Sequence, residues 1–344
     1  MTPRQILAAT TLLVAACGDS IQGEDPDAQS TFTVSGTITG YAGSGLVLGE
    51  GTAQIAVVTG ATTFAFAAAY HAGDHYELVV KSQPTGPIQD CTAPNGAGSI
   101  SSNVSIAIVC TTRTYPITPT IGGVLRDGLV LQNNGADDLA IAAPQGGGPV
   151  TASFATQIAS GATYALTVKT NPAGQACTVS GGTGTVVNGE ITSIMVNCTN
   201  SQYAVGGTVT GLAGSGLTLK NQGGNDLAIN ANGTFAFTTT HVFGDAYEIT
   251  VDGNPISPWQ TCTVTQGTGT VAAGDVNTIA ITCTTNRYDV AVTVMGVSGA
   301  GLVLQNNGGD DLAVSAPGAL TFTSQVESGA TFLVEVATNP TNPW

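Results

Sequence analysis

Cysteine is the residue type whose spacing carries the clearest chemistry in this sequence. The chain of 344 residues contains seven cysteines, an odd number, so at least one must differ from the rest. In one stretch, Cys262-Thr263-Val264 leads to a turn at 273–275, and the chain returns to Cys283, so the ends of this strand pair meet. We therefore predict three disulfides between neighbouring cysteines, which are Cys91 and Cys110, Cys177 and Cys198, and Cys262 and Cys283. A cysteine-based metal site is the weaker alternative, because the spacing lacks a CxxC pair and no histidine lies near.

The seventh cysteine, Cys17, follows a segment with the layout of a secretory signal. Arg4 is the only charge before an apolar run over 6–16, which is too short to span a bilayer. The run ends in Val14-Ala15-Ala16-Cys17, which resembles the bacterial lipobox, and a polar, acidic stretch follows. The resemblance implies a signal peptide over 1–16, a lipid on Cys17 and a tether over 17–30. It also implies an outer-membrane lipoprotein of the bacterial cell envelope whose partner is the membrane, and it leaves the surface and the periplasmic face open.

Three loops combine acidic and amide side chains with glycine, and their oxygens could bind Ca²⁺. Hard oxygen ligands clustered in a loop suit this ion. The alternative interpretation is a hairpin turn, because Asn-Gly and Gly-Gly supply the positive φ angles that such turns need. The turn is favoured, since no EF-hand spacing is present and a related loop at Glu50-Gly51-Thr52 lacks the acidic pair. The carboxylates of the calcium hypothesis are Asp137, Asp138, Asp226, Asp310 and Asp311.

Histidine and tryptophan are the remaining candidates for binding. His71 and His75 would lie about 13 Å apart on an extended strand, too far to share an ion, so with His241 they are expected in solvated loops. Trp259 and Trp344 each follow a proline, where an exposed ring could stack on a sugar but more often caps a core. No His-centred serine or aspartate pattern, nucleophile elbow or phosphate loop occurs. The sequence therefore predicts a protein that is not an enzyme and has no cofactor or small-molecule substrate.

Composition excludes several classes of partner. Lys and Arg number 7 against 22 Asp and Glu, which gives a formal net charge of −15. So few basic residues argue against nucleic acid and anionic membrane surfaces as partners. Hydrophobic residues make up 42% of the chain, too many for a disordered acidic tail. We expect folded domains with many glycine-containing turns.

The elements that position these residues come from one unit in four copies, with a period of about 85 residues. A Gly-Leu-x-Leu element begins at Gly45, Gly128, Gly216 and Gly301. Apolar residues alternate within a copy, as in 247–251, which indicates strands with one buried face. We predict an all-β tandem array of Ig-like, seven-stranded β-sandwich repeats, with an edge position for the proline-interrupted first strand of the second copy. The predicted repeats are 31–112, 113–200, 201–285 and 286–344.

Part of the third copy carries a family resemblance. Gly233-Thr234-Phe235-Ala236-Phe237, then Gly244 and the strand over 247–251, resembles the prealbumin-like or carboxypeptidase-regulatory-like sandwich, as does the opening strand over 205–211. The array over 32–344 resembles tandem Ig-like repeats of bacterial surface lipoproteins. The resemblance implies a lipid-anchored stalk or display array rather than an activity. The alternative is an adhesin or ligand-binding module, with or without calcium, for an unknown surface protein or glycan.

The fourth copy is shorter than the others. In copies one and three a cysteine follows seven residues after Pro84 and Pro255, but the same offset from Pro340 falls beyond Trp344. We therefore predict an incomplete last repeat, from a truncated product or an incomplete gene. The alternative is that another chain donates the missing strands, since an open sandwich would expose an unpaired edge.

Overall fold

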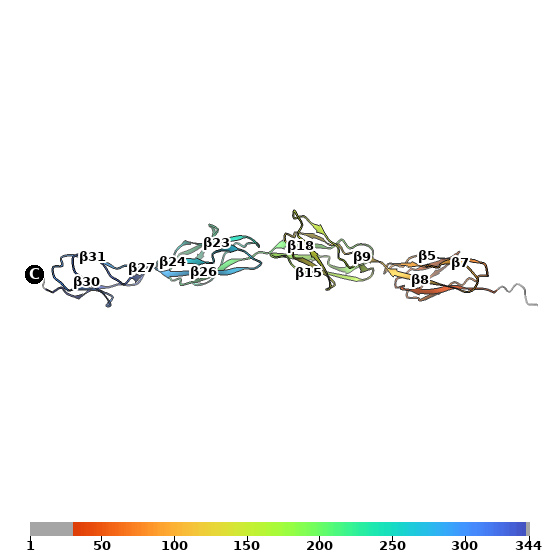
Figure 1. Ribbon diagram of the computed structural model, residues 1–344, viewed down its shortest axis with the longest axis horizontal. Helices are drawn as coiled ribbons and strands as arrows, with labels where there is room; N and C mark the ends of the chain where they lie inside the picture. The colour runs from red at the N-terminus through yellow and green to blue at the C-terminus, as the bar shows by residue number, and fades with distance from the viewer. Residues whose placement is uncertain (1–29, 342–344) are drawn as a thin grey trace, which may run out of the picture. The chain divides into compact units, whose positions relative to one another are not determined.

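The computed structural model describes residues 30–341, and within this range the regular elements are strands and no helix occurs. Cys17 and the lipobox lie outside the described residues, as does Trp344. Figure 1 shows the strands gathered in successive stretches of the chain. The all-β class predicted from the alternating pattern is confirmed.

The first and third repeats have the same eight-stranded arrangement in two four-stranded sheets. The strands of the first are β1 (Val34–Thr39), β2 (Val47–Glu50), β3 (Ala53–Ala56), β4 (Thr63–Ala65), β5 (His75–Ser82), β6 (Gln89–Thr92), β7 (Ala97–Ser99) and β8 (Val104–Thr112). Those of the third are β19 (Val205–Thr210), β20 (Leu217–Asn221), β21 (Gly224–Ile229), β22 (Gly233–Ala236), β23 (Ala246–Gly253), β24 (Gln260–Thr265), β25 (Thr268–Thr270) and β26 (Val276–Thr285).

In each of these sandwiches the first and last strands lie side by side at the centre of one sheet. The order β22-β19-β26-β24 places β19 parallel to β26, and the two outer strands run antiparallel to their neighbours. The other sheet has the order β21-β20-β23-β25. The first repeat repeats this topology with β4-β1-β8-β6 and β3-β2-β5-β7.

The second and fourth repeats vary this plan. The second has sheets β13-β10-β18-β16 and β12-β11-β15-β17 and a pair β14-β9. Its strands are β9 (Thr114–Tyr115), β10 (Thr120–Gly122), β11 (Leu129–Asn133), β12 (Asp137–Ile141), β13 (Val150–Thr151), β14 (Ile158–Ala159), β15 (Thr163–Thr170), β16 (Gln175–Ser180), β17 (Thr183–Thr185) and β18 (Met195–Asn200). The fourth contains β27 (Arg287–Tyr288), β28 (Ala291–Val294), β29 (Leu302–Asn306), β30 (Asp310–Val314), β31 (Gly318–Thr321), β32 (Val326–Glu327) and β33 (Val334–Thr338).

The alternating sequence pattern decides which side chains form the core. In β20, Leu217 and Leu219 are fully buried, and in β26 Ile279 and Ile281 face them from the other sheet. Burying each such side chain contributes about 1.5–3 kcal/mol. The first repeat has its own core around Leu48 and the fourth has one around Phe322. Several separate cores, rather than one large one, therefore hold the array together.

Two details of the fold differ from the sequence prediction. The complete sandwiches have one strand more than the expected seven, because the segment after Thr265 leaves the cysteine hairpin and β25 pairs with β23 of the other sheet. The edge position predicted for the first strand of the second repeat is wrong. β10 lies between β13 and β18, and Pro116 and Pro119 precede it rather than interrupt it.

Among residues 286–341 the structure shows no counterparts of β24, β25 and β26. Apolar side chains that are buried elsewhere are exposed there. Phe332 is 61% exposed, whereas Tyr247 at the matching position of the third repeat is 9% exposed. In the third repeat, β25 pairs with β23 and places Gly269 opposite Tyr247.

The described chain divides into two compact units. One extends to Tyr115 and includes Ala159–Ala162 and Thr185–Gly189, and the other contains the remaining residues from Pro116 on. Strands pair within the predicted repeats, but the limits of the four repeats as folding units stay a prediction.

Candidate functional site

The three predicted disulfides are present, and each joins an edge strand to its central neighbour. They are Cys91–Cys110, Cys177–Cys198 and Cys262–Cys283, with sequence separations of 19, 21 and 21 residues. In each bridge the two cysteines are directly opposed in the antiparallel register. In the third bridge the Cα atoms lie 4.0 Å apart, as suits a non-hydrogen-bonded pair.

Opposed cysteines of this kind turn their backbone N–H groups away from the partner strand, and a side-chain amide satisfies the first one. Cys262 donates its N–H to Oδ1 of Asn254 at 2.8 Å. Gln83 and Asn171 accept the matching N–H in the other two repeats, at 2.7 and 2.8 Å. In each bridged repeat, a side chain of the same repeat therefore satisfies the outward-facing N–H of the first cysteine on the edge strand.

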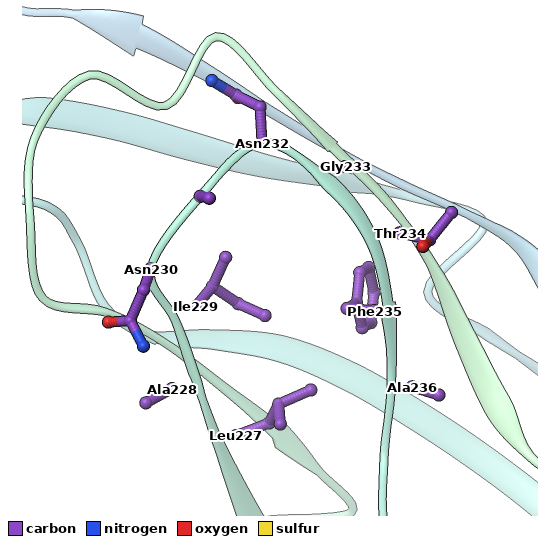
Figure 2. A pocket seen from close by; sticks show the side chains of 10 residues that line it. Leu227, Ala228, Ile229, Asn230, Asn232, Gly233, Thr234, Phe235 and Ala236 are labelled. Carbon is purple, nitrogen blue, oxygen red and sulfur yellow. The ribbon is translucent and has the colours of Figure 1, made fainter.

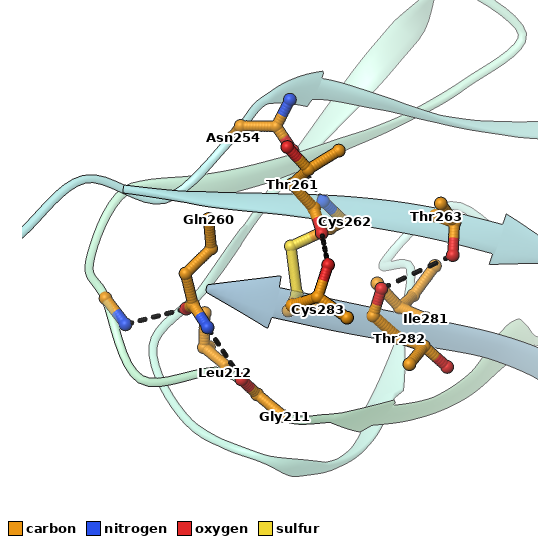
Figure 3. The surroundings of a disulfide bond; sticks show 12 residues. Gly211, Leu212, Asn254, Gln260, Thr261, Cys262, Thr263, Ile281, Thr282 and Cys283 are labelled. Carbon is orange, nitrogen blue, oxygen red and sulfur yellow. Dashed lines mark hydrogen bonds between the residues drawn. A yellow bond between two sulfur atoms is a disulfide. The ribbon is translucent and has the colours of Figure 1, made fainter. Parts of the chain in front are cut away.

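A buried glutamine two residues before the first cysteine holds the adjacent loop (Figure 3). Gln260 is 2% exposed, and its Oε1 accepts N–H bonds from Ala213 and Gly214, both at 2.8 Å. Its Nε2 donates to the carbonyl of Gly211 at 2.8 Å. The side chain thus replaces a missing strand partner for a loop that leaves β19.

The same glutamine arrangement recurs in the other two disulfide-bonded repeats. Gln89 is fully buried and bonds the N–H groups of Ala42 and Gly43 and the carbonyl of Gly40. Gln175 bonds the N–H of Leu125 and the carbonyl of Gly123. Glutamine is mostly exposed in folded proteins, so its residue type alone gives no signal for this buried role.

The acidic loops form the turns that the favoured interpretation predicts. Asn134 and Asn307 have φ angles of 49° and 52°, and Gly135 and Gly308 follow with 71° each. Adjacent carboxylates then begin the next strand, where successive side chains point to opposite faces. Asp137 and Asp138 therefore cannot act together on one ion, and the same holds for the pair in the fourth repeat.

Several of the calcium-candidate carboxylates already have partners in the chain. Asp138 pairs with Lys169 and also accepts from Gln132 at 2.6 Å, and the Lys169 ammonium holds the pKa of Asp138 below its usual range. Asp310 accepts from the Thr323 hydroxyl at 2.7 Å and from the N–H of Ser324 at 2.8 Å, and these bonds lower its pKa.

The other calcium candidates, Asp137, Asp226 and Asp311, have fewer hydrogen-bond partners than Asp138 and Asp310. Asp137 accepts from the N–H of Thr156 at 3.3 Å, and Asp311 from Gln305 at 2.5 Å. Asp226 lies on β21, and the nearby Lys220 ammonium is paired with Asp252 at 2.8 Å. Within residues 30–341 no three His, Cys, Asp or Glu side chains converge as metal ligands. Calcium binding stays a prediction without a ligand set around it.

The histidines fall into two settings. His71 lies in a loop beside Asp74, 3.8 Å away, and His75 is at the exposed start of β5. His241 is different from the prediction of a solvated loop residue, because its side chain is 11% exposed. Its Nε2 lies 2.9 Å from the amide nitrogen of the buried Asn221. The His241 side chain is thus largely buried in the third repeat.

In the first repeat, Tyr70 stands at the position of His241 and also makes a buried polar contact. Tyr70 donates its hydroxyl proton to Glu50, and both residues are 8% exposed. Burial, followed by the hydrogen bond to Glu50, raises the pKa of Tyr70 to about 12. Sequence alignment of the copies gives Asn133, Asn221 and Asn306 at the position of Glu50, and all three are buried.

The third repeat also has a groove between its edge strands β21 and β22 (Figure 2). It has a volume of about 530 Å³, and Ile229 and Phe235 form its apolar floor. Asn232, at the turn between the strands, is tied to the N–H and carbonyl of Leu212 at 2.8 Å each. No charged side chain lines this groove.

Together, the sandwiches, bridges and glutamine contacts define an all-β array of disulfide-bonded repeats. No family model and no curated protein matches the sequence. Among solved structures, the Bacillus anthracis TIE protein is similar with a TM-score of 0.42 and 10% identity, covering 74% of this chain and 51% of that one. The chain thus spans about half the length of that protein. No helix in the described residues is long and apolar enough to cross a membrane.

Proposed function

We propose that the chain is a non-enzymatic, lipid-anchored protein of the bacterial cell envelope that serves as a stalk or display array of β-sandwich repeats. The observation that carries the proposal is the division of the cysteines. Six are joined in bridges inside the repeats, and the seventh, Cys17, follows the lipobox-like Val14-Ala15-Ala16. A cysteine with that sequence context and no place among the bridges is suited to lipidation.

The bridges also support export. Disulfides persist in oxidising compartments such as the periplasm and the cell surface. Closing a loop of about 20 residues stabilises a domain by roughly 3 kcal/mol, a sizeable fraction of a small domain's stability. Repeats stapled in this way hold their shape without a ligand, which is what a stalk requires. We propose an outer-membrane location and assign no catalytic residue.

Lipidation can be tested directly. The full chain is expressed in a bacterium fed with an alkyne analogue of palmitate, and the label on the protein is measured together with its partition into membranes. We expect labelling of the wild type and none for Cys17→Ser, while Cys283→Ser, a cysteine variant within a bridge, keeps the label. An unlabelled wild type, or a Cys17→Ser protein that still pellets with membranes, contradicts the proposal.

The second candidate is an adhesin that binds a glycan or a surface protein. It is favoured by Trp259, which is 56% exposed, and by the uncharged groove of Figure 2 in the same repeat. A glycan array and a calcium-dependent melting shift separate the two candidates. Binding that Trp259→Ala abolishes supports the adhesin, whereas no binding and no calcium shift leaves the stalk.

A further inference from the structure

Each of the three bridged repeats contacts the repeat that follows it around one backbone position. This position, here called the tail residue, directly precedes the buried glutamine, and the three tail residues are Ile88, Gly174 and Trp259. Opposite it lies a residue before a glycine in the turn that leads to β15, β23 or β33, here called the tip residue. The three tip residues are Ser160, Phe243 and Ser328. In each case the tail and tip residues belong to the same compact unit.

Ser160 makes the first of these contacts through both its side chain and its backbone. Its Oγ accepts the N–H of Ile88 at 3.0 Å and donates to the carbonyl of Val187 at 2.8 Å. The N–H of Ser160 donates to the carbonyl of Arg113 at 2.8 Å, and Arg113 donates its own N–H to Ile88 at 3.0 Å. Three residues from three segments thus form a closed ring of hydrogen bonds.

Ser328 repeats this ring two repeats further along. Its Oγ accepts the N–H of Trp259 at 2.9 Å, and its N–H donates to the carbonyl of Asn286 at 2.8 Å. Asn286 donates its N–H to the carbonyl of Trp259 at 3.0 Å. The glycine after each serine packs on a proline, so that an added Cβ on Gly329 would lie 3.6 Å from Pro258. The same geometry at two places indicates a contact set by the sequence.

Phe243 makes a contact of a different kind. The tail residue is Gly174. Its carbonyl accepts the N–H of Ser201 at 2.9 Å, as the carbonyls of Ile88 and Trp259 accept an N–H in the other two contacts. A Cβ on Gly174 would lie 2.2 Å from Cβ of Phe243, so only glycine fits there. Arg126 completes the contact, because its Nη2 donates to the carbonyl of Phe243 at 3.0 Å and its guanidinium lies 4.7 Å from the ring centroid. A partly buried cation over a ring is attracted to the ring's negative face.

The serine contact and the phenylalanine contact cannot form on the same repeat end. Arg126 stands where the first and third repeats have Gly43 and Gly214. A Cβ at those glycines would lie 2.7 Å from the carbonyl oxygen of Pro87 and 2.5 Å from that of Pro258, so an arginine is not accommodated in either. A phenylalanine tip has no room over a tail residue that carries a side chain, and a serine tip would leave Arg126 without its ring.

We propose that the chain matches neighbouring repeats through two mutually exclusive docking surfaces on the repeat ends. The serine-type surface has Ile88 or Trp259 as tail residue and accepts a following repeat with a Ser-Gly tip. The phenylalanine-type surface has Gly174 and Arg126 and accepts a repeat with a Phe-Gly tip. The partner of each surface is the tip of the next repeat in the same chain. This proposal is independent of lipid anchoring.

The serine-type surface is tested in the full chain by amide hydrogen exchange at Trp259, whose N–H is held by the Ser328 hydroxyl. Ser328→Ala removes the acceptor, and we expect exchange at Trp259 to rise roughly tenfold, the equivalent of one ordinary hydrogen bond. Ser328→Phe places the wrong tip on this surface and should raise it at least as much. Unchanged exchange in β26 shows that the third repeat remains folded. The matched control is Ser315→Ala, an exposed serine of the same repeat.

The phenylalanine-type surface is tested by a double-mutant cycle read at the N–H of Ser201. Arg126→Ala and Phe243→Ala should each raise exchange there, and the double variant should exchange no faster than the faster single variant, because the two side chains act as one contact. Additive effects of the two substitutions overturn the proposal. So does a Ser328→Phe chain whose Trp259 exchange equals that of the Ser315→Ala control.

Discussion

Replacing Gln260 by alanine is the sharpest test of how these sandwiches are held together. The side chain is 2% exposed and makes three hydrogen bonds of 2.8 Å to backbone groups of the loop after β19. Alanine removes all three and leaves two N–H groups and one carbonyl without partners in a closed part of the fold. The loop would lose the contacts that fix it beside the disulfide of Figure 3.

The expected magnitude follows from these contacts. A typical hydrogen bond contributes about 0.5–1.5 kcal/mol net, so three give about 3 kcal/mol. A domain of this kind is stable by about 5–15 kcal/mol, and the substitution therefore removes a large share. With an m-value of about 2 kcal/mol/M in urea, the midpoint for this repeat should fall by about 1.5 M.

Trp259 supplies a local probe for the assay. The chain has two tryptophans, so urea unfolding is followed by fluorescence in a Trp344→Phe background, where the signal comes from Trp259 alone. Amide exchange in β26 serves as a second probe that does not depend on the ring beside Gln260. The matched control is Gln202→Ala, which removes an exposed glutamine whose Oε1 accepts from Thr240, and should change stability by less than about 0.5 kcal/mol.

Equal midpoint shifts for Gln260→Ala and Gln202→Ala would contradict a stabilising role of the Gln260 hydrogen bonds. So would wild-type stability of Gln260→Leu, which keeps the volume and removes the polar atoms. Leucine would then show that packing rather than hydrogen bonding to the loop is the role of this position.

Cys283→Ser should lower the free energy of unfolding of its repeat by roughly 3 kcal/mol, measured by urea unfolding, and an unchanged midpoint would show that the bridge is passive. An NMR titration should place the pKa of Asp138 below its usual range, and Lys169→Met should raise it. The stability that Asp138 contributes is present above the unfolded pKa of about 3.9 and is lost as the pH falls through the lower folded pKa. Tyr70 should ionise near pH 12 in an absorbance titration. Its contribution is then complete below about pH 10, its unfolded pKa, and is lost as the pH rises through 12. Tyr70→Phe should cost about 2 kcal/mol at neutral pH, because Glu50 loses its donor, and a neutral effect would contradict this contact.

The sequence predicted the strands and the bridges because both depend on short-range patterns. The alternation in 247–251 appears as the burial pattern of β23, and the hairpin argument places Cys262 opposite Cys283. It did not predict that β25 crosses to the other sheet, since Thr-Gly-Thr gives no signal for a change of partner. Strand exchange between sheets depends on the position of β23, which local sequence does not contain.

The sequence also did not predict the buried polar residues, and these differ between the copies. At one core position the first repeat pairs Glu50 with Tyr70, and the third pairs Asn221 with His241. In each pair one side chain hydrogen-bonds the other, so exchanging one member alone would leave a buried donor or acceptor without that partner.

The same logic of matched pairs applies at the repeat ends, where Arg126 occurs with Phe243 and the serine tips occur with Ile88 or Trp259. Copies that descend from one unit can diverge freely at exposed strand positions, but at these sites a change on one side requires a change on the other. If a repeat were moved to another place in the array, its strands and bridge would fold as before, whereas its tip would meet the wrong tail. We therefore expect a chain with repeats two and three exchanged to retain its disulfides and to lose the protected amide at position 88.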